Sequence, residues 1–176
     1  DIYHQATIQV TDDEHSQRNP SIWKKRIVWE DNRLGNWDLY MHVIGFYPDT
    51  DPVRANHPVF TGTDIGYMNE FDQQNPQVSD HYIVYQSLQN FHWDIYFYTF
   101  INPIAGTARP VVTEMRAQTD PSIWGSRVVW LDERDYTGSG GYKNDVWMWE
   151  KPAGIDLAVG IFTESDPAVL GEELDY

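Results

Sequence analysis

The 176-residue sequence contains no cysteine, which excludes disulfides and every chemistry that depends on a thiol. It has no run of eighteen apolar residues, so we expect no membrane-inserted helix. No stretch keeps apolar residues at the i, i+3, i+4 spacing of an amphipathic helix. Cations are few, since 12 Lys and Arg stand against 27 Asp and Glu, a formal net charge of −15. That acidic balance argues against nucleic acid and against anionic membranes as partners.

What the sequence has instead is an internal repeat. The stretch 20–29, PSIWKKRIVW, is matched by 76–85, PQVSDHYIVY, and by 121–130, PSIWGSRVVW. A degraded fourth copy, PAVLGEELDY, occupies 167–176, so that the copies begin 56, 45 and 46 residues apart. A second element follows each of the first three copies, and the chain also begins with it, as DIYH. Its three later copies are DLYM, DIYF and DVWM, which start at Asp38, Asp94 and Asp145.

Each repeat contains four short expected strands. After the proline comes a strand and then a tight turn, such as Lys24-Lys25 or Gly125-Ser126. The next run is apolar on consecutive residues, which favours a strand that is covered on both faces. A polar lead-in precedes each proline, and ten prolines and twelve glycines punctuate the chain at intervals typical of turns. The expected strands of the first repeat are 21–23, 26–29 and 38–43, and fourth strands are expected at 6–11 and 110–115.

A four-stranded antiparallel unit of this length, repeated in series, is typical of a β-propeller blade. The stretches PSIWGSRVVWLDER and PSIWKKRIVWEDNRLGNWDLYMH resemble the TolB-like, WD40-like propeller repeats of secreted and cell-surface proteins of bacteria and archaea. The resemblance covers nearly the whole chain and implies an all-β fold. The second repeat departs from it at 86–89 and the third inserts about six residues near 136–144, and we expect both changes in a hairpin loop. The sequence thus predicts one β-propeller domain over 1–176, with blade repeats that begin near Pro20, Pro76, Pro121 and Pro167.

The two ends of the chain fit complementary parts of one blade. Asp1 stands in the slot of Asp38, and Tyr176 stands in the slot of Trp29. We therefore expect a four-bladed ring in which N- and C-terminal strands together close the last blade. Two alternatives remain: the chain is a piece of a longer propeller, or its terminal strands pair with another subunit and drive self-assembly.

The aromatic residues fall mostly in repeat positions. Trp29, Tyr85 and Trp130 share the second-strand slot, where large rings would fill the wedge between twisted sheets. We expect these three to be buried, and we assign a structural role also to the recurrent Asp38, Asp94 and Asp145. Trp23 and Trp124 stand at turns instead, where an exposed ring could stack on the face of a sugar. These two are the candidate ligand-binding residues.

Acidic residues cluster with an arginine after the second strands, at Glu30, Asp31 and Arg33 and again at Asp132, Glu133 and Arg134. The recurrence favours a structural role, in which the aspartate that starts the third strand accepts hydrogen bonds from turn amides and from Arg. Clustered carboxylates also suit calcium, which takes six to eight oxygen ligands. The inserted loop of the third repeat is the best place for a metal, with Asp132, Asp135 and Asp145 as candidate ligands.

Catalytic motifs are not evident. The six histidines form no HExxH pair, and neither GTDIG nor TGSGG is a nucleophile elbow. Convergence of His15, His57, Glu14 and Glu70 on one channel mouth would indicate chemistry, but no spacing in the sequence requires it. We therefore assign no catalytic residue, and the balance of the sequence is against an enzyme.

The sequence thus predicts a non-catalytic β-propeller module, extracellular or at the cell surface, that presents its loops to a protein or carbohydrate partner. Two alternatives stay open. One is a carbohydrate-active propeller, a lectin or a polysaccharide lyase, that uses exposed tryptophans and channel carboxylates. The other is a calcium-stabilised structural subunit of a surface layer or filament. No cofactor other than Ca²⁺ is expected.

Overall fold

The computed structural model describes residues 7, 9–45, 71–101, 106–135 and 143–151, and the backbone of 56–58. In this part of the chain every regular element is a β-strand, and every pairing is antiparallel. No helical segment there has the length and hydrophobicity needed to span a bilayer. The strands are β1 (Gln17–Trp23), β2 (Arg26–Asp31), β3 (Asp38–Val43), β4 (Asn56–Pro58), β5 (Gln73–Ser79), β6 (Tyr82–Gln89), β7 (His92–Phe100), β8 (Gly106–Val112), β9 (Gln118–Trp124), β10 (Arg127–Asp132) and β11 (Asp145–Glu150).

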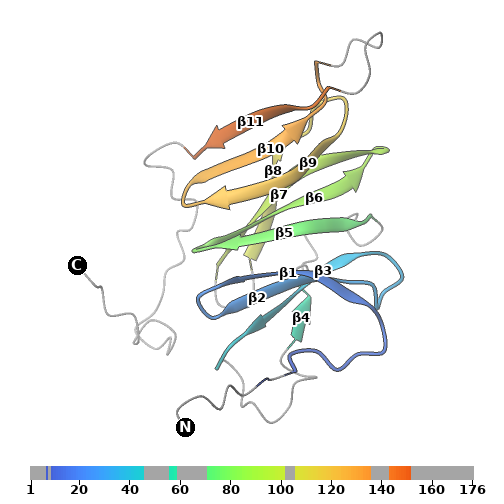
Figure 1. Ribbon diagram of the computed structural model, residues 1–176, viewed down its shortest axis with the longest axis vertical. Coiled ribbons are helices and arrows are strands. Elements are labelled where there is room, and N and C mark those ends of the chain that lie inside the picture. Colours follow the sequence, from blue (N-terminus) through green and yellow to red (C-terminus); the bar gives the residue numbers. More distant parts are fainter. Residues whose placement is uncertain are drawn as a thin grey trace, which may run out of the picture.

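The strands form three sheets in the described residues, one for each of the first three repeats (Figure 1). We call the sheet β1-β2-β3-β4 blade 1, the sheet β5-β6-β7-β8 blade 2, and the sheet β9-β10-β11 blade 3. Figure 1 shows the blades side by side in chain order, with β1 beside β5. The second and third strands pair in the same register each time, as Asp31↔Asp38, Ser87↔Asp94 and Asp132↔Asp145. The all-β prediction and the equivalence of the repeats are thereby confirmed.

The first strand of each blade is longer than predicted, because it includes the polar lead-in. Each first strand begins at a glutamine. Between its second and fifth residues, the register of its pairing with the second strand shifts. At each shift the residue before the proline adopts a positive φ, 49° at Asn19, 54° at Asn75 and 52° at Asp120. Asn and Asp tolerate this left-handed conformation, and a bulge accommodates a proline that cannot donate to a ladder. The lead-in is therefore a β-bulge and not a loop.

Two other sequence-based boundaries are wrong. The described residues of 6–11 form no strand, and the fourth strand of blade 2 is Gly106–Val112, which ends inside the predicted 110–115. Residues 86–89, expected in a hairpin loop, are paired within β6. Blade 2 extends its ladder until Gln89 faces His92, and the hairpin shrinks to Asn90-Phe91 with φ of 50° and 69°. The inserted loop of the third repeat falls between β10 and β11, and 136–142 lie outside the described residues.

Neighbouring blades pack face to face through apolar side chains. In blade 1, Val28, Leu39 and Met41 form what we call the forward face, and they pack on the rear face of blade 2, which contains Ile83 and Tyr85. The equivalent forward-face residues of blade 2 are Val84 and Ile95, which pack on the rear face of blade 3. The second-strand aromatics lie on the rear faces and are 3%, 0% and 4% exposed at Trp29, Tyr85 and Trp130. This is the burial that their position in the repeat predicts.

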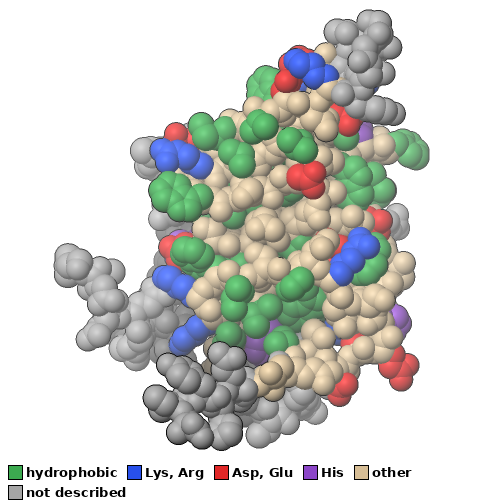
Figure 2. All heavy atoms as spheres, viewed as in Figure 1, with side chains coloured by type: hydrophobic (Ala, Val, Ile, Leu, Met, Phe, Trp, Pro, Cys, Tyr) green, Lys and Arg blue, Asp and Glu red, His purple; other side chains and the backbone are tan. Residues whose placement is uncertain are grey.

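The forward face of blade 3 is not covered by another described blade. Val146 and Met148, the equivalents of the buried Leu39 and Met41, are 74% and 58% exposed. Figure 2 shows apolar side chains along this upper edge, over β10 and β11. The three sheets do not close into a ring within the described residues. Closure by 1–4 and 167–176 concerns residues outside the described part, so the four-bladed ring stays a prediction.

Gly106 should be intolerant of any side chain. A Cβ at this position would overlap the backbone oxygen of Thr99 and the ring of Tyr98, because β8 begins against β7 here. We expect Gly106→Ala to lower the free energy of unfolding by about 1–3 kcal/mol, the usual cost of overpacking. Urea denaturation measures the change, with Thr107→Ala on the exposed neighbour as the control. Equal stability of the two variants would contradict the tight β7–β8 contact.

Candidate functional sites: paired carboxylates, turn tryptophans and a cavity between blades

Blades 1 and 3 share a Trp-x-Asp-x-Arg arrangement that the sequence analysis did not isolate. Trp29 Nε1 donates to Asp31 Oδ2 over 3.2 Å, and Arg33 donates to both oxygens of the same carboxylate. In blade 3, Trp130 Nε1 donates to Asp132 Oδ2 over 2.9 Å, and Arg134 donates to it as well. The bridging aspartate ends the second strand, whereas we expected the aspartate that starts the third. For Arg that expectation is wrong, because Arg33 and Arg134 reach the aspartate two residues before them; Asp38 accepts from the side-chain amide of Asn36 over 2.9 Å.

The guanidinium of this arrangement also covers an aromatic ring. Arg33 lies 4.1 Å from the ring centre of Tyr40, and Arg134 lies 3.9 Å from that of Trp147, which occupies the equivalent slot. Blade 2 replaces all three members together, with Tyr85, Ser87 and Gln89. Gln89 there accepts a hydrogen bond from Tyr96 over 2.9 Å. Because the three residues are replaced together, they form one structural unit. We therefore assign Asp31 and Asp132 a role in stabilising the fold.

The buried carboxylates divide into two electrostatic classes. Burial acts to raise the pKa of Asp31 and Asp132, but hydrogen bonds from the neighbouring Arg and Trp outweigh it and hold each pKa below its ordinary value. Burial raises the pKa of Asp38 to about 6 and that of Asp94 to about 6. The amide of Asn36 opposes the shift at Asp38, and nearby His92 opposes it at Asp94. Asp38 and Asp94 occupy equivalent positions in different blades, and His92 Nδ1 lies 3.0 Å from Asp94 Oδ1, so the two carboxyl groups belong to separate sites.

These shifts predict a mildly acidic stability optimum. Between about pH 4 and pH 6 the folded protein keeps protons on Asp38 and Asp94 that the unfolded chain has released, so stability falls as pH rises through this window. Asp38→Asn removes this loss and should raise the free energy of unfolding by about 1–3 kcal/mol at pH 8 but hardly at pH 4.5. Urea titrations at the two pH values measure it, with Asp145→Asn as the control. The same gain at both pH values would contradict the burial of a protonated Asp38.

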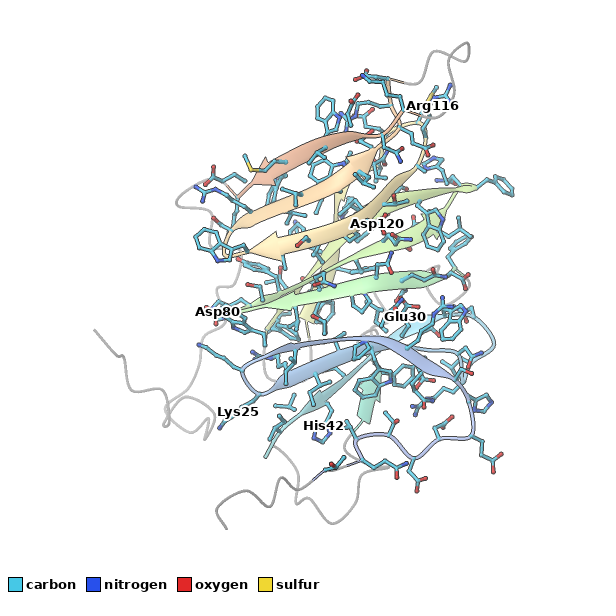
Figure 3. All side chains as sticks on the ribbon, in the orientation of Figure 1. Lys25, Glu30, His42, Asp80, Arg116 and Asp120 are labelled. Carbon is cyan, nitrogen blue, oxygen red and sulfur yellow. The ribbon has the colours of Figure 1, made fainter. Side chains whose placement is uncertain are left out.

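A polar ladder links the bulges of the three first strands. Glu30 is fully buried, and its carboxylate accepts from Arg18 Nε over 2.6 Å, from Asn19 Nδ2 over 2.7 Å and from the backbone N–H of Asn75 over 2.7 Å. Asn75 Nδ2 in turn donates to Asp120 Oδ1 over 3.0 Å. Figure 3 shows Glu30 and Asp120 on the side away from Lys25 and Asp80. The ladder crosses both blade interfaces, which explains why an Asn or Asp precedes each proline.

The two candidate ligand-binding tryptophans lie at equivalent ends of β1 and β9. Trp23 is 41% exposed and Trp124 is 74% exposed. Both precede the turns between first and second strands, and we call this end of the blades the turn face. Trp124 lies on the forward side of blade 3, which has no described neighbour, whereas Trp23 has blade 2 beside it. The Arg127 guanidinium lies 6.0 Å from the ring centre of Trp124 and leaves much of the ring open.

The candidate metal ligands are not gathered around one point in the described residues. Asp132 accepts from Trp130 and Arg134, and Asp145 Oδ2 accepts from Lys143 over 3.1 Å. Asp135 is exposed at the start of the inserted loop. No group of three or more His, Asp or Glu in the described ranges has the arrangement of a metal site. Calcium binding therefore stays a prediction.

Convergence of the four residues considered from sequence is not tested, because only His15 and Glu14 have described side chains. His15 Nδ1 lies 2.7 Å from Asp13 Oδ1 in a surface loop that leads into β1. His57 belongs to β4, of which only the backbone is described, and Glu70 lies outside the described residues. Glu14 is exposed in the same loop as His15.

A cavity of about 250 Å³ lies between blades 2 and 3. Phe97 of β7 and Trp149 of β11 stack across the interface with ring centres 5.8 Å apart at 21°. Tyr82 packs edge-on to Phe97, and its hydroxyl accepts a hydrogen bond from Lys151 Nζ over 2.7 Å. The site is not evident from the sequence, because no single repeat contains it. The remaining lining residues are Thr99, Arg109, Pro110, Ile123, Gly125, Ser126 and Val128.

No protein-family model matches the chain, and no curated protein matches it in sequence. Among solved structures, the chain is similar to TolB from Acinetobacter baumannii, a β-propeller protein, with a TM-score of 0.50 and 14% sequence identity. The match covers 73% of this chain and 29% of that one, so the chain spans less than a third of its length. At this identity the likeness concerns the fold alone. The chain therefore has an all-β, propeller-like fold of antiparallel sheets that resembles TolB at the level of fold.

Proposed function

We propose that the chain is a non-catalytic β-propeller module of an extracellular or cell-surface protein, which binds a protein or carbohydrate partner through its loops. The observation that carries the proposal is the use of its recurrent polar residues. Asp31, Asp132 and Glu30 hold strands and blades together, and none of them is left in a position to act on a substrate. What remains is a rigid scaffold with exposed turns and hairpin tips, which is the usual arrangement for binding.

The proposal is tested by measuring binding of a polymer separately from its cleavage. The immobilised protein is exposed to surface polysaccharides and to secreted proteins, and both the bound fraction and the chain length of each polysaccharide are measured. We expect retention of at least one polymer with no shortening of any of them. Shortened chains would identify an enzyme and overturn the proposal. Absence of retention at micromolar protein would overturn it as well.

Carbohydrate recognition is the second candidate, and the open ring of Trp124 favours it. An exposed indole stacks on the apolar face of a sugar, and binding through it needs no catalytic group. Trp124→Ala should weaken retention of a bound polysaccharide about tenfold, the loss of one aromatic contact. Trp23→Ala, at the equivalent and more covered position, is the matched control. Equal retention by wild type and Trp124→Ala would remove this tryptophan from the binding surface.

A third candidate is the calcium-stabilised subunit of a surface layer or filament that the sequence left open, and it has a separate test. Its candidate ligands are Asp132, Asp135 and Asp145, and self-assembly would use the terminal strands. A ligand that binds only the folded state raises Tm. A rise in Tm with millimolar Ca²⁺ that EDTA reverses, and that Asp135→Asn abolishes, would support this alternative over the first candidate. Identical melting curves in Ca²⁺ and EDTA would remove it.

A further inference from the structure

The cavity between blades 2 and 3 occurs where the repeat is broken. At the equivalent place between blades 1 and 2, the guanidinium of Arg26 lies 4.4 Å from the ring centre of Phe100. It also donates from Nη1 to the backbone oxygen of Asp80 over 3.2 Å. The first interface thus carries a cation from the earlier blade, a ring from the later one, and the Asp80 carboxylate beside them.

The second interface exchanges the two partners. Tyr82 stands in the slot of Arg26, and Lys151 stands in the slot of Phe100, so the ring comes from the earlier blade and the cation from the later one. Lys151 Nζ lies 5.4 Å from the centre of the Tyr82 ring. At the adjoining turn, Asp80-His81 is replaced by Gly125-Ser126. The exchange therefore removes a carboxylate and an imidazole from the place where the cavity opens.

The charge of the lining is opposite to that of the protein. Lys151 and Arg109 both line the cavity, and no Asp or Glu is among the described residues of its lining. Arg109 pairs with Phe97 across β7 and β8, which fixes its position beside the aromatic wall. The chain as a whole carries a formal charge of −15. Two cations and no carboxylate in the described lining, within so acidic a protein, are complementary to an anion and would repel a cation.

The cavity walls indicate which kind of anion would fit. Phe97 and Trp149 stack on each other and form an aromatic wall, and Ile123, Val128 and Pro110 add aliphatic surface. Ligand sites are usually about 300–1,000 Å³, so a cavity of about 250 Å³ suits a single ring rather than an oligomer. The equatorial hydroxyls of a sugar would lose water against these apolar walls without a partner, whereas an aromatic ring loses nothing there.

We propose that this cavity binds a small aromatic carboxylic acid. The ring stacks on Phe97 and Trp149, and the carboxylate lies at the mouth, where Lys151 and Arg109 supply positive charge. Lys151 Nζ donates to the Tyr82 hydroxyl over 2.7 Å, and this contact holds the cation in place for the anion. This site is separate from Trp124 and goes beyond the proposed function, because it selects a free small molecule rather than a polymer.

The test compares three probes by isothermal titration: benzoate, its neutral isostere benzamide, and glucuronate. We expect benzoate to bind about tenfold more tightly than benzamide, the difference that one charge-assisted contact makes, and glucuronate to bind more weakly than benzoate. Equal affinity for benzoate and benzamide, or tighter binding of glucuronate, would overturn the proposal. Absence of benzoate binding at millimolar concentration would overturn it too.

A matched pair of variants locates the site. Ser126→Asp introduces a carboxylate at the mouth and should weaken benzoate at least tenfold, whereas Ser126→Asn, of the same size, should change affinity by less than about threefold. Ser126 is exposed on a turn, so both variants keep the core intact, and melting curves verify it. Lys151→Met should also lose about tenfold. Unchanged affinity in Ser126→Asp would place the ligand elsewhere. The retention assay is independent of this result, so failure here leaves the module proposal standing.

Discussion

Trp130→Ala is expected to lower the free energy of unfolding by about 3–5 kcal/mol, the range for truncation of a large buried aromatic. The indole is 4% exposed and packs with Val84, Ile95 and Val128 at the interface between blades 2 and 3. Its loss leaves a cavity there and removes the Nε1–H donor that Asp132 accepts over 2.9 Å. Both effects act in the same direction.

Urea denaturation monitored by far-UV circular dichroism measures this change. Trp124→Ala is the matched control, because that indole is 74% exposed and its truncation should cost under about 1 kcal/mol. A loss below 1 kcal/mol for Trp130→Ala would show that this strand does not face blade 2. The spectrum of the wild type should itself be that of a β-protein, and a helical spectrum would contradict the fold.

Asp132→Ala is expected to cost about 2–4 kcal/mol, because it leaves the partly buried guanidinium of Arg134 and the indole N–H of Trp130 without their acceptor. The reason is the asymmetry between making and breaking such a network. Removing one partner leaves the polar groups of the others buried without a hydrogen bond. Replacing all three residues together need not leave any buried polar group unpaired.

Blade 2 supplies the control for this prediction. The triple variant Trp130→Tyr, Asp132→Ser, Arg134→Gln transplants the set found at Tyr85, Ser87 and Gln89. It should lose clearly less than the sum of its three single substitutions, since residues within one network are not additive. Additive losses would show that the three residues act independently and that the Trp-x-Asp-x-Arg arrangement is not a unit.

The repeat allowed much of the fold to be predicted, because its positions have the same environment in every blade. Consecutive apolar residues at 27–29 and the recurrent DLYM element located β2 and β3 and their equivalents. The lead-in was missed, since the left-handed φ at Asn19, Asn75 and Asp120 hides a strand behind a polar sequence. Residues 86–89 were misplaced, because the loss of an Asp-x-Arg stretch was interpreted as a loop change when it lengthened a ladder.

The sites were harder to predict, because they arise between repeats. Trp23 and Trp124 were found as exceptions at turns, and both rings are exposed. The cavity could not be found in the same way, since it depends on Tyr82, Phe97, Trp149 and Lys151, which belong to different strands of two blades. One signal was available: at the slots of Arg26 and Phe100, the later repeat exchanges cation and ring. Comparison of repeat slots across interfaces, rather than along the chain, reveals it.

Distances between equivalent turns test the central claim most directly, namely that three equivalent blades stand side by side in chain order. Lys25, His81 and Ser126 occupy the same exposed turn position in blades 1, 2 and 3, and the chain has no cysteine of its own. Spin labels on Lys25→Cys, His81→Cys and Ser126→Cys, introduced in pairs, allow each separation to be measured by pulsed electron resonance. We expect similar separations for 25–81 and 81–126, and a longer one for 25–126. A 25–126 separation no longer than the other two would contradict the account.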